Sequence, residues 1–229
     1  MSLPSWLQPL AAALPGVGAE YFTRFLPPPG GGRDSAVLAL FGEGPAGPDL
    51  LIIERAATLR SHAGQPAFPG GAQDPGDAGP VAAALREARE EVGVRPSSVQ
   101  VVGVLPPLWL PASGFVVHPV VAWWREPHEV SVVDVAEVAA VTRVPLAELA
   151  DPGHRLRVSH PSGFVGPAFE VHGMIVWGFT AGLIAGLLRL GGWELPWDDS
   201  RVQQLDPATV ALAARTSVRP SAPLIQEEP

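Results

Sequence analysis

Three glutamates stand at a spacing that suits the binding of a divalent cation. On a helical wheel drawn for residues 81–92, Glu87, Glu90 and Glu91 project together from one face, beside an apolar stripe that must face the core. Like charges three and four residues apart repel each other by roughly 0.2–0.5 kcal/mol on an isolated helix. A hard cation such as Mg²⁺ binds carboxylate oxygens and would remove this repulsion. A solvated acidic face is the alternative interpretation of the same pattern.

The residue types that are missing narrow the chemistry further. The 229 residues include no cysteine and no lysine, so all 15 basic side chains are arginines. This composition excludes a cysteine nucleophile, a thiolate zinc site, a P-loop lysine and a lysine Schiff base. There is no G-x-S-x-G sequence, and the six histidines lack metal-ligand spacing. Acid–base chemistry by carboxylate or imidazole, hydroxyl nucleophiles and oxygen-ligated metals remain.

Charge and hydropathy restrict the partners. With 47% hydrophobic residues, the chain can bury the core of one large domain or two small ones. The net charge of −8 argues against broad binding to nucleic acid or to an anionic membrane. The first residues lack a basic segment followed by an apolar run, so we expect a cytoplasmic protein with no secretion signal. The oligomeric state stays open, with a homodimer as one option.

The elements that must position these glutamates follow from periodicity and from turn residues. Helices are predicted at residues 3–14, 81–92 and 179–190, the last one a buried core helix too short to cross a bilayer. Strands are predicted at 35–42, 49–55, 99–105, 115–124 and 137–144, followed by a helical turn at 145–149 and a meander over 155–160 and 169–176. Residues 55–79 are predicted to form one long loop. We expect an N-terminal helix with a Pro/Gly linker over residues 1–33, a catalytic domain over 34–215 and a mobile tail over 216–229.

A nine-residue run on the acidic helix resembles a known signature. Residues 86–94 read R-E-A-R-E-E-V-G-V, which is similar to the second half of the Nudix box of hydrolases that cleave nucleoside diphosphates linked to another group. The first half departs from the box, because Asp77 stands where the family has glutamate and eight residues instead of seven precede Arg86. The departure leaves open whether this acid pairs with Arg86, but it does not affect the three glutamates.

A second run lies upstream, in the predicted loop. The sequence R-A-A-T-L-R-S-H-A-G-Q-P-A-F-P-G-G resembles the additional motif of the coenzyme A pyrophosphatase branch of the Nudix family, with Ala56 where serine is usual. The positions in register are Arg55, Arg60, Gly64, Phe68, Pro69, Gly70 and Gly71. Arginine binds phosphate oxygens in pairs, and glycines allow close approach of the backbone. Taken without this context, Arg55 would simply end a strand and Arg60 would be solvated.

The resemblance implies a fold and a function. The fold class is α/β, a Nudix-type α/β/α sandwich with a mixed β-sheet. The implied reaction is hydrolysis of the pyrophosphate of coenzyme A to adenosine 3′,5′-bisphosphate and 4′-phosphopantetheine, with Mg²⁺ or Mn²⁺ as cofactor. The metal shell would comprise Glu87, Glu90, Glu91 and the carbonyl of Gly70 or Gly71, with one glutamate as an alternative base. Arg86 would orient a glutamate. The implied substrate-binding residues are Arg55, Arg60, His62, Gly64, Phe68, Gly70 and Gly71.

Weaker and competing interpretations remain. Glu137 is a further, weaker candidate for a base, and its position favours the end of an exposed strand. A Nudix hydrolase acting on ADP-ribose, NADH or a nucleotide sugar is the first alternative function. A Nudix-fold module that binds nucleotides without catalysis is the second, and the altered first half of the box is the feature in its favour.

Overall fold

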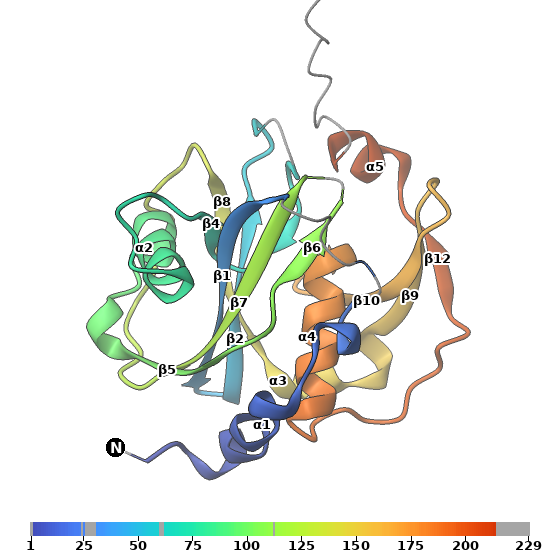
Figure 1. Ribbon diagram of the computed structural model, residues 1–229. Helices are drawn as coiled ribbons and strands as arrows, with labels where there is room; N and C mark the ends of the chain where they lie inside the picture. Colours follow the sequence, from blue (N-terminus) through green and yellow to red (C-terminus); the bar gives the residue numbers. More distant parts are fainter. Residues whose placement is uncertain (1, 24, 26–30, 60–61, 112, 214–229) are drawn as a thin grey trace, which may run out of the picture.

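The computed structural model describes residues 2–23, 25, 31–59, 62–111 and 113–213. The tail predicted at 216–229 lies outside these residues. Figure 1 shows the arrangement of the helices and strands. Their bounds, in chain order, are α1 (Gln8–Ala13), β1 (Arg33–Gly44), β2 (Gly47–Arg55), β3 (Pro66–Ala67), β4 (Gly70–Ala72), α2 (Pro80–Val92), β5 (Val99–Val104), β6 (Leu108–Leu110), β7 (Phe115–Trp124), β8 (Val138–Pro145), α3 (Leu146–Ala150), β9 (Arg155–Ser159), β10 (Val165–Val171), β11 (Met174–Val176), α4 (Gly178–Leu190), β12 (Val202–Gln204) and α5 (Pro207–Ala213).

The main sheet is mixed, and β1 is its central strand. β1 pairs in parallel with β7 and antiparallel with β2 and β4. The strands β5 and β6 add to β7, while β3 and β8 add to β2. The two antiparallel partners of β1 divide it, because residues 35–37 pair with β4 and residues 41–44 pair with β2. The chain therefore returns to β1 directly before it enters α2, which brings the glycine-rich loop beside that helix.

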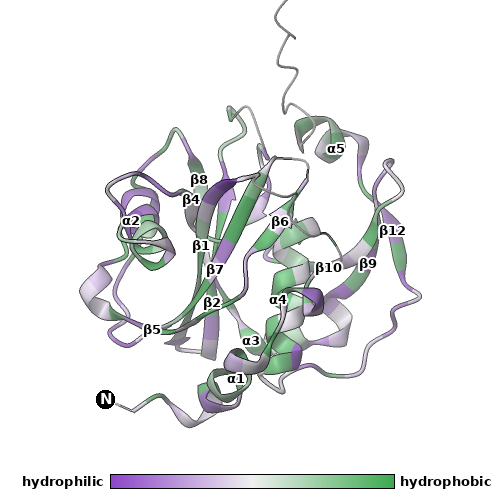
Figure 2. Ribbon diagram, in the orientation of Figure 1, coloured by the Kyte–Doolittle hydropathy of each residue, from purple (hydrophilic) through white to green (hydrophobic). Residues whose placement is uncertain are grey.

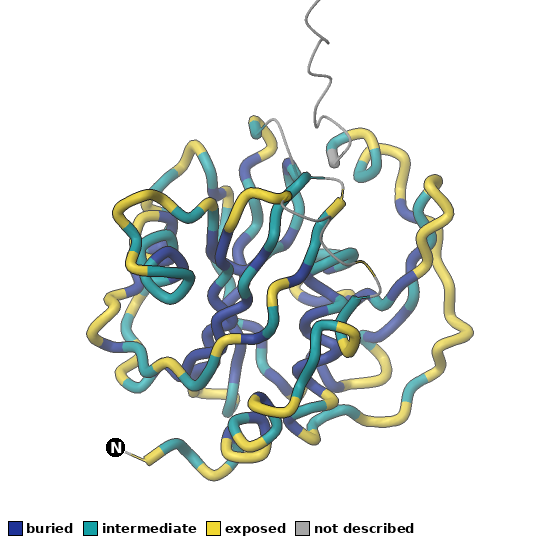
Figure 3. Tube along the Cα trace, in the orientation of Figure 1, coloured by how far each residue is buried: buried dark blue, intermediate teal, exposed yellow. Residues whose placement is uncertain are grey.

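Alternation along the strands produces a core on each face of the sheet. One cluster includes Leu38, Leu40 and the buried alanines of α2. The other includes Phe41, Leu50 and the apolar side of α4. The buried parts of the trace coincide with the central strands and α4, and these segments are also the apolar ones (Figures 2 and 3). Helices on both faces of a mixed sheet give the α/β/α architecture that the sequence predicted.

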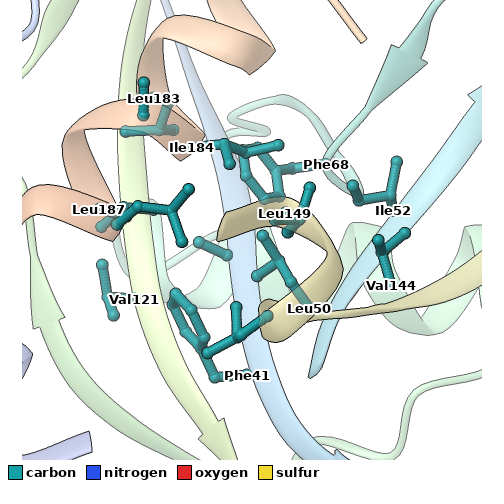
Figure 4. Packing of buried hydrophobic residues seen from close by; sticks show 14 of the residues in the cluster. Phe41, Leu50, Ile52, Phe68, Val121, Val144, Leu149, Leu183, Ile184 and Leu187 are labelled. Atoms are coloured by element: carbon teal, nitrogen blue, oxygen red, sulfur yellow. The ribbon is translucent and has the colours of Figure 1, made fainter. Parts of the chain in front are cut away.

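Helix α4 anchors the second core. Figure 4 shows Leu183, Ile184 and Leu187 of α4 pointing at Leu149 and at the sheet residues Phe41, Leu50 and Val121. All of these side chains are buried. The helix has 13 residues, and in the described part of the chain no helix is long and apolar enough to cross a membrane. The prediction of a buried core helix is confirmed.

The N-terminal segment forms less helix than predicted. Residues 3–14 fold as a 3₁₀ turn at Ser5–Leu7 followed by the short helix α1. The segment is nevertheless amphipathic, because Leu7, Leu10 and Leu14 are buried in the same core as α4. This segment therefore packs into the core between the main sheet and α4.

Short strands escaped the sequence-based prediction. The loop expected at 55–79 contains β3 and β4, of two and three residues, which are too short to show a period. The strand expected at 169–176 is a hairpin, because His172 (φ 50°) and Gly173 (φ 74°) form a tight turn with positive φ at both positions. The predicted meander is confirmed, because β9, β10 and β11 pair antiparallel in chain order. Together with β12 they form a second, four-stranded sheet beside α4, and the sequence predicted neither β12 nor the separation of this sheet from the main one.

Candidate active site

Helix α2 has well-defined ends. Pro80 occupies the first turn, where its missing N–H costs nothing. Gly93 adopts a left-handed conformation with φ 76°, and its N–H and that of Val94 bond to carbonyls of the last turn. Ala83, Ala84, Ala88 and Val92 are buried against the sheet. These contacts fix the rotation of the helix and hence the directions in which its glutamates point.

Glu91 points inward, so the alternative interpretation of a solvated acidic face is wrong for this residue. Only 1% of Glu91 is exposed. Its Oε2 accepts a hydrogen bond from the Gly70 N–H at 3.0 Å, and its Oε1 lies 4.0 Å from Arg55 Nη1. Glu90 is the most exposed of the three glutamates, and its side chain is 55% exposed.

Burial controls the protonation of Glu91. Removal from water raises the pKa of Glu91 to about 8, and the neighbouring charges of Glu87 and Glu137 act in the same direction. The Gly70 N–H and Arg55 oppose this rise only in part. The carboxylate form thus lacks sufficient positive charge in its surroundings, as expected for a group that would gain from a bound cation.

Arg86 holds the polar side of the helix together. Its Nε and Nη2 donate to the carboxylate of Asp77, with an Nη2–Oδ2 distance of 2.9 Å. Its Nη1 donates to Glu87 Oε1 at 2.9 Å and to Glu90 Oε2 at 3.0 Å. A further bond runs from Nη2 to the Ala72 carbonyl. Arg86 therefore orients glutamates, in agreement with the expectation for this residue.

The altered first half of the box preserves its ion pair. The question left open by the sequence was whether Asp77 reaches Arg86 across one additional residue, and the structure has the two side chains in a forked contact. The bond from Arg86 and the N–H of Asp74 keep the pKa of Asp77 below its usual range. Asp77 thus reaches Arg86 although aspartate is shorter than glutamate and one additional residue separates the two positions.

Two glycines allow the carboxylates of Glu87 and Glu91 to lie directly against the backbone of the loop. Gly70 lies so close to β1 that a Cβ there would overlap the Ala36 carbonyl, and it has φ 156°. A Cβ on Gly71 would lie 2.5 Å from Glu87 Oε1. Neither position accepts a side chain without displacement of the neighbouring group. The Gly70 N–H was not among the predicted contacts, and a glycine facing a buried acid in three dimensions leaves no signal in the linear sequence.

Glu137 lies close to this group although it comes from another segment. Burial raises the pKa of Glu87, and the charge of Glu137 raises it further, as it does for Glu91. The Glu137 carbonyl accepts from the Ala56 N–H at 2.8 Å, next to the pairing of Arg55 with Val138. The start of β8 therefore brings a fourth acidic side chain toward Glu87 and Glu91.

The upstream segment folds back toward the helix. Gly64 has φ 66° and donates its N–H to the Arg55 carbonyl, while Arg55 donates its N–H to the Gln65 carbonyl. His62 Nδ1 contacts Gln65 Oε1 at 2.9 Å. Arg60 lies outside the described residues. These contacts hold Gly64 and Gln65 beside Arg55, at the end of β2.

Phe68 requires a correction. The sequence placed it among the substrate-binding residues, but only 2% of it is exposed. Its ring packs in the core with Ile184 of α4 and Leu149 of α3 (Figure 4). A ring buried in this way offers almost no surface to a substrate, and its role is to fasten the glycine loop to the core.

The residues present fit a hard divalent cation. Glu91 Oε1 is buried and has no hydrogen-bond partner among the described residues. Besides Arg55, the charged side chains that act on Glu91 are the carboxylates of Glu87 and Glu137. Carboxylate is the donor type that Mg²⁺ and Mn²⁺ prefer. Within the described ranges, no three acidic or histidine side chains form a ready-made ligand group. Glu87 and Glu90 are instead bonded to Arg86, so both carboxylates would have to exchange part of that contact for an ion.

Comparison with known proteins agrees with this geometry. The NUDIX domain family model matches residues 32–161. A protein of Cronobacter sakazakii named uncharacterized Nudix hydrolase NudL is 46% identical over 166 residues, which cover 69% of this chain and 83% of the relative. A protein of the same name from Citrobacter koseri is 46% identical over 155 residues, covering 64% of this chain and 77% of the relative.

The chain also resembles solved structures. A Nudix hydrolase of M. smegmatis, RenU, aligns with a TM-score of 0.47 and 18% identity, covering 72% of this chain and 89% of that one. The family model extends over more than half of the chain and includes the glycine loop, α2 and Glu137. The chain belongs to the Nudix hydrolase family.

Proposed function

We propose that this Nudix hydrolase cleaves the pyrophosphate bond of coenzyme A and its derivatives, with Mg²⁺ or Mn²⁺ as cofactor. Water attacks one phosphorus of the pyrophosphate, and the bridging oxygen leaves with the other phosphate. The products are two phosphate monoesters, adenosine 3′,5′-bisphosphate and 4′-phosphopantetheine or its acyl form. The substrate is anionic, so its site needs fixed positive charge in a chain with a net charge of −8.

The observation that carries the proposal is the contact between the upstream segment and α2. Arg55 faces Glu91, Gly70 donates to the same carboxylate, and Gly71 leaves space for Glu87. Arg55 has a buried Nε with no hydrogen-bond partner among the described residues. A guanidinium with free donors beside acidic groups suits phosphate oxygens that arrive together with a cation. The upstream segment, which distinguishes the coenzyme A branch by resemblance, is thus part of the same site.

The roles of the side chains follow from their surroundings. Glu91 and Glu87 would hold the cation, with Glu90 and the carbonyl of Gly71 as further ligands. A bound Mg²⁺ supplies Lewis acidity and lowers the pKa of a water molecule. Arg86 fixes Glu87 and Glu90 in position through its bonds. Glu137, or a glutamate of α2 not engaged with the ion, would accept the proton of the attacking water. Arg55, Arg60 and the loop around His62 and Gly64 would bind the phosphates.

Product analysis tests this proposal directly. The purified chain is incubated with Mg²⁺ and, in parallel, with coenzyme A, ADP-ribose or NADH, and the products are separated by chromatography. We expect adenosine 3′,5′-bisphosphate and 4′-phosphopantetheine from coenzyme A, with a higher kcat/KM than for the other two substrates. Much faster turnover of ADP-ribose would overturn the choice of substrate. Binding of coenzyme A without turnover in excess Mg²⁺ or Mn²⁺ would instead favour the non-catalytic module.

A further inference from the structure

A hollow outside the glutamate cluster lies beneath α5. It has a volume of about 450 Å³ and is bounded by the ends of β9 and β12 and by the inner side of α5. Figure 1 shows α5 as a separate short helix above these strand ends. Most of the lining is apolar and comes from Pro161, Leu205, Pro207, Val210 and Ala211. Leu205 also belongs to the small core beneath the second sheet, so the floor of the hollow is firmly packed.

The polar residues of the hollow bring neither a carboxylate nor a guanidinium. Ser159, His160 and Gln204 complete its lining. The Ser162 N–H donates to His160 Nδ1 at 3.1 Å, and Ser162 Oγ lies 2.8 Å from the same nitrogen, so Nε2 is the ring nitrogen that would face a ligand. The imidazole stacks on Trp177 with ring centroids 5.7 Å apart. A lining of this kind suits a ligand with methyl groups and amides, and it does not suit a phosphate, which requires positive charge.

Helix α5 contacts the loop around Gly64, which is part of the proposed phosphate-binding segment. Leu212 packs directly on Gly64, because a Cβ on Gly64 would lie 2.5 Å from Leu212 Cδ2. Gly64 is bonded to Arg55, which faces Glu91. Gly70, the other contact of Glu91, follows Gly64 by six residues, which span at most about 20 Å when extended. Helix α5, which forms one wall of the hollow, therefore also contacts the loop that leads to the two groups facing Glu91.

We propose that the hollow beneath α5 binds the uncharged pantetheine arm of the substrate. This inference rests on the proposed function, because it assigns one half of coenzyme A to a subsite. The adenosine half carries a 3′-phosphate and has no counter-charge in the hollow, whereas the pantetheine half offers two methyl groups, two amides and a thiol. Ser159, Gln204 and His160 would bond to the amides, and the apolar lining would cover the methyl groups. α5 then forms a wall of the substrate site.

Filling the hollow tests the subsite. Ala211 is exposed and lines the hollow, whereas Ala208 is exposed on the same helix and does not line it. Ala211→Trp should weaken binding of 4′-phosphopantetheine at least about 10-fold, which corresponds to about 1.4 kcal/mol, and leave binding of adenosine 3′,5′-bisphosphate unchanged. Ala208→Trp should behave as the unchanged protein in both titrations. The measurements are calorimetric titrations with Mg²⁺, preceded by circular dichroism to verify the fold.

Two further results separate this inference from the proposed function. In a methyl NMR titration of the unchanged protein, 4′-phosphopantetheine should shift the signals of Leu205 and Val210. If those signals do not move and both tryptophan variants bind alike, the subsite is refuted, and hydrolysis of coenzyme A by the unchanged protein would leave the proposed function standing. If the signals move and Ala211→Trp binds weakly, but coenzyme A is not hydrolysed, the subsite stands and the proposed function falls.

Discussion

Arg86 and Arg55 both face glutamates of α2, but their surroundings differ. Arg86 bonds to Asp77, Glu87, Glu90 and the Ala72 carbonyl, and these contacts use its Nε, Nη1 and Nη2. Arg55 has one contact with Glu91, at 4.0 Å, and a buried Nε without a partner among the described residues. The arginine with engaged donors maintains the geometry of the site, whereas the one with free donors has capacity for a ligand. The comparison predicts that replacing Arg55 lowers activity and spares stability, whereas replacing Arg86 lowers stability as well.

The largest effect is expected at the acid that Arg55 faces. Glu91→Gln keeps an oxygen for the Gly70 N–H but removes the charge, so hydrolysis should fall by about 10²- to 10⁴-fold. The fold should persist, because the replaced group is a buried charge with an unfavourable environment. Steady-state rates with coenzyme A and Mg²⁺, together with the melting temperature, measure both. Unaltered Mg²⁺-dependent activity in this variant would refute the metal assignment.

Arg55→Gln should reduce activity while sparing stability. We expect kcat/KM to fall about 10- to 100-fold, because Arg55 would bind substrate phosphate beside the metal ligand Glu91, with little change in melting temperature. Arg89→Gln is the matched control, because Arg89 is an exposed arginine on α2 and its replacement changes the net charge equally. An equal loss of activity in the two variants would mean that Arg55 acts only through the overall charge.

The buried position of Glu91 predicts a pH dependence of the metal-free protein. The pKa of Glu91 is about 8 in the folded chain, compared with an ordinary value of 4.5, so between these limits the folded state retains a proton that the unfolded state has lost. The free energy of unfolding should therefore fall as the pH rises through this window, by up to about 1.4 kcal/mol per pH unit. Melting temperatures in a chelator at several pH values measure it, and Glu91→Gln should have a flatter profile. The same slope in both proteins would assign the effect to other groups.

Arg86→Gln provides the complement to the Arg55 variant. Loss of its charged hydrogen bonds should lower the free energy of unfolding by about 2 kcal/mol. Chemical denaturation, again with Arg89→Gln as the control, gives the difference. Activity should also decline, because Glu87 and Glu90 lose the group that orients them. If Arg86→Gln unfolds at the same denaturant concentration as the control, Arg86 is not the structural half of this pair.

The sequence predicted the bounds of the helices and strands better than the directions of individual side chains. Residues 115–124 and the ends of α2 were predicted closely, because β-branched runs, Pro80 and Gly93 are local signals. The inward turn of Glu91 was missed, since a helical wheel gives angles and does not reveal that the glycine loop covers that side. Phe68 was assigned to the substrate for a similar reason, as its motif position does not indicate that α4 lies above it.

The sequence predicted neither β12 and α5 nor the separation of the meander from the main sheet. β12 and α5 are short, and the support for α5 comes from Gly64, more than 140 positions earlier. The hairpin at His172 and Gly173 had a readable cue, a glycine after a polar residue between two apolar runs. Pairing over long separations, by contrast, depends on the complete tertiary structure.

The parallel pairing of β1 with β7 has a consequence for how the molecule assembles. Nine consecutive positions match, from Arg33 with Phe115 to Phe41 with Trp123, so two central neighbours are 82 residues apart in the chain. Closing so large a loop is entropically costly and is characteristic of slowly folding topologies. During synthesis on the ribosome, the glycine loop and α2 emerge before β7, the parallel partner of β1. A nascent chain that ends before Phe115 contains all the proposed metal ligands, yet it lacks both Glu137 and the strand that completes the centre of the main sheet.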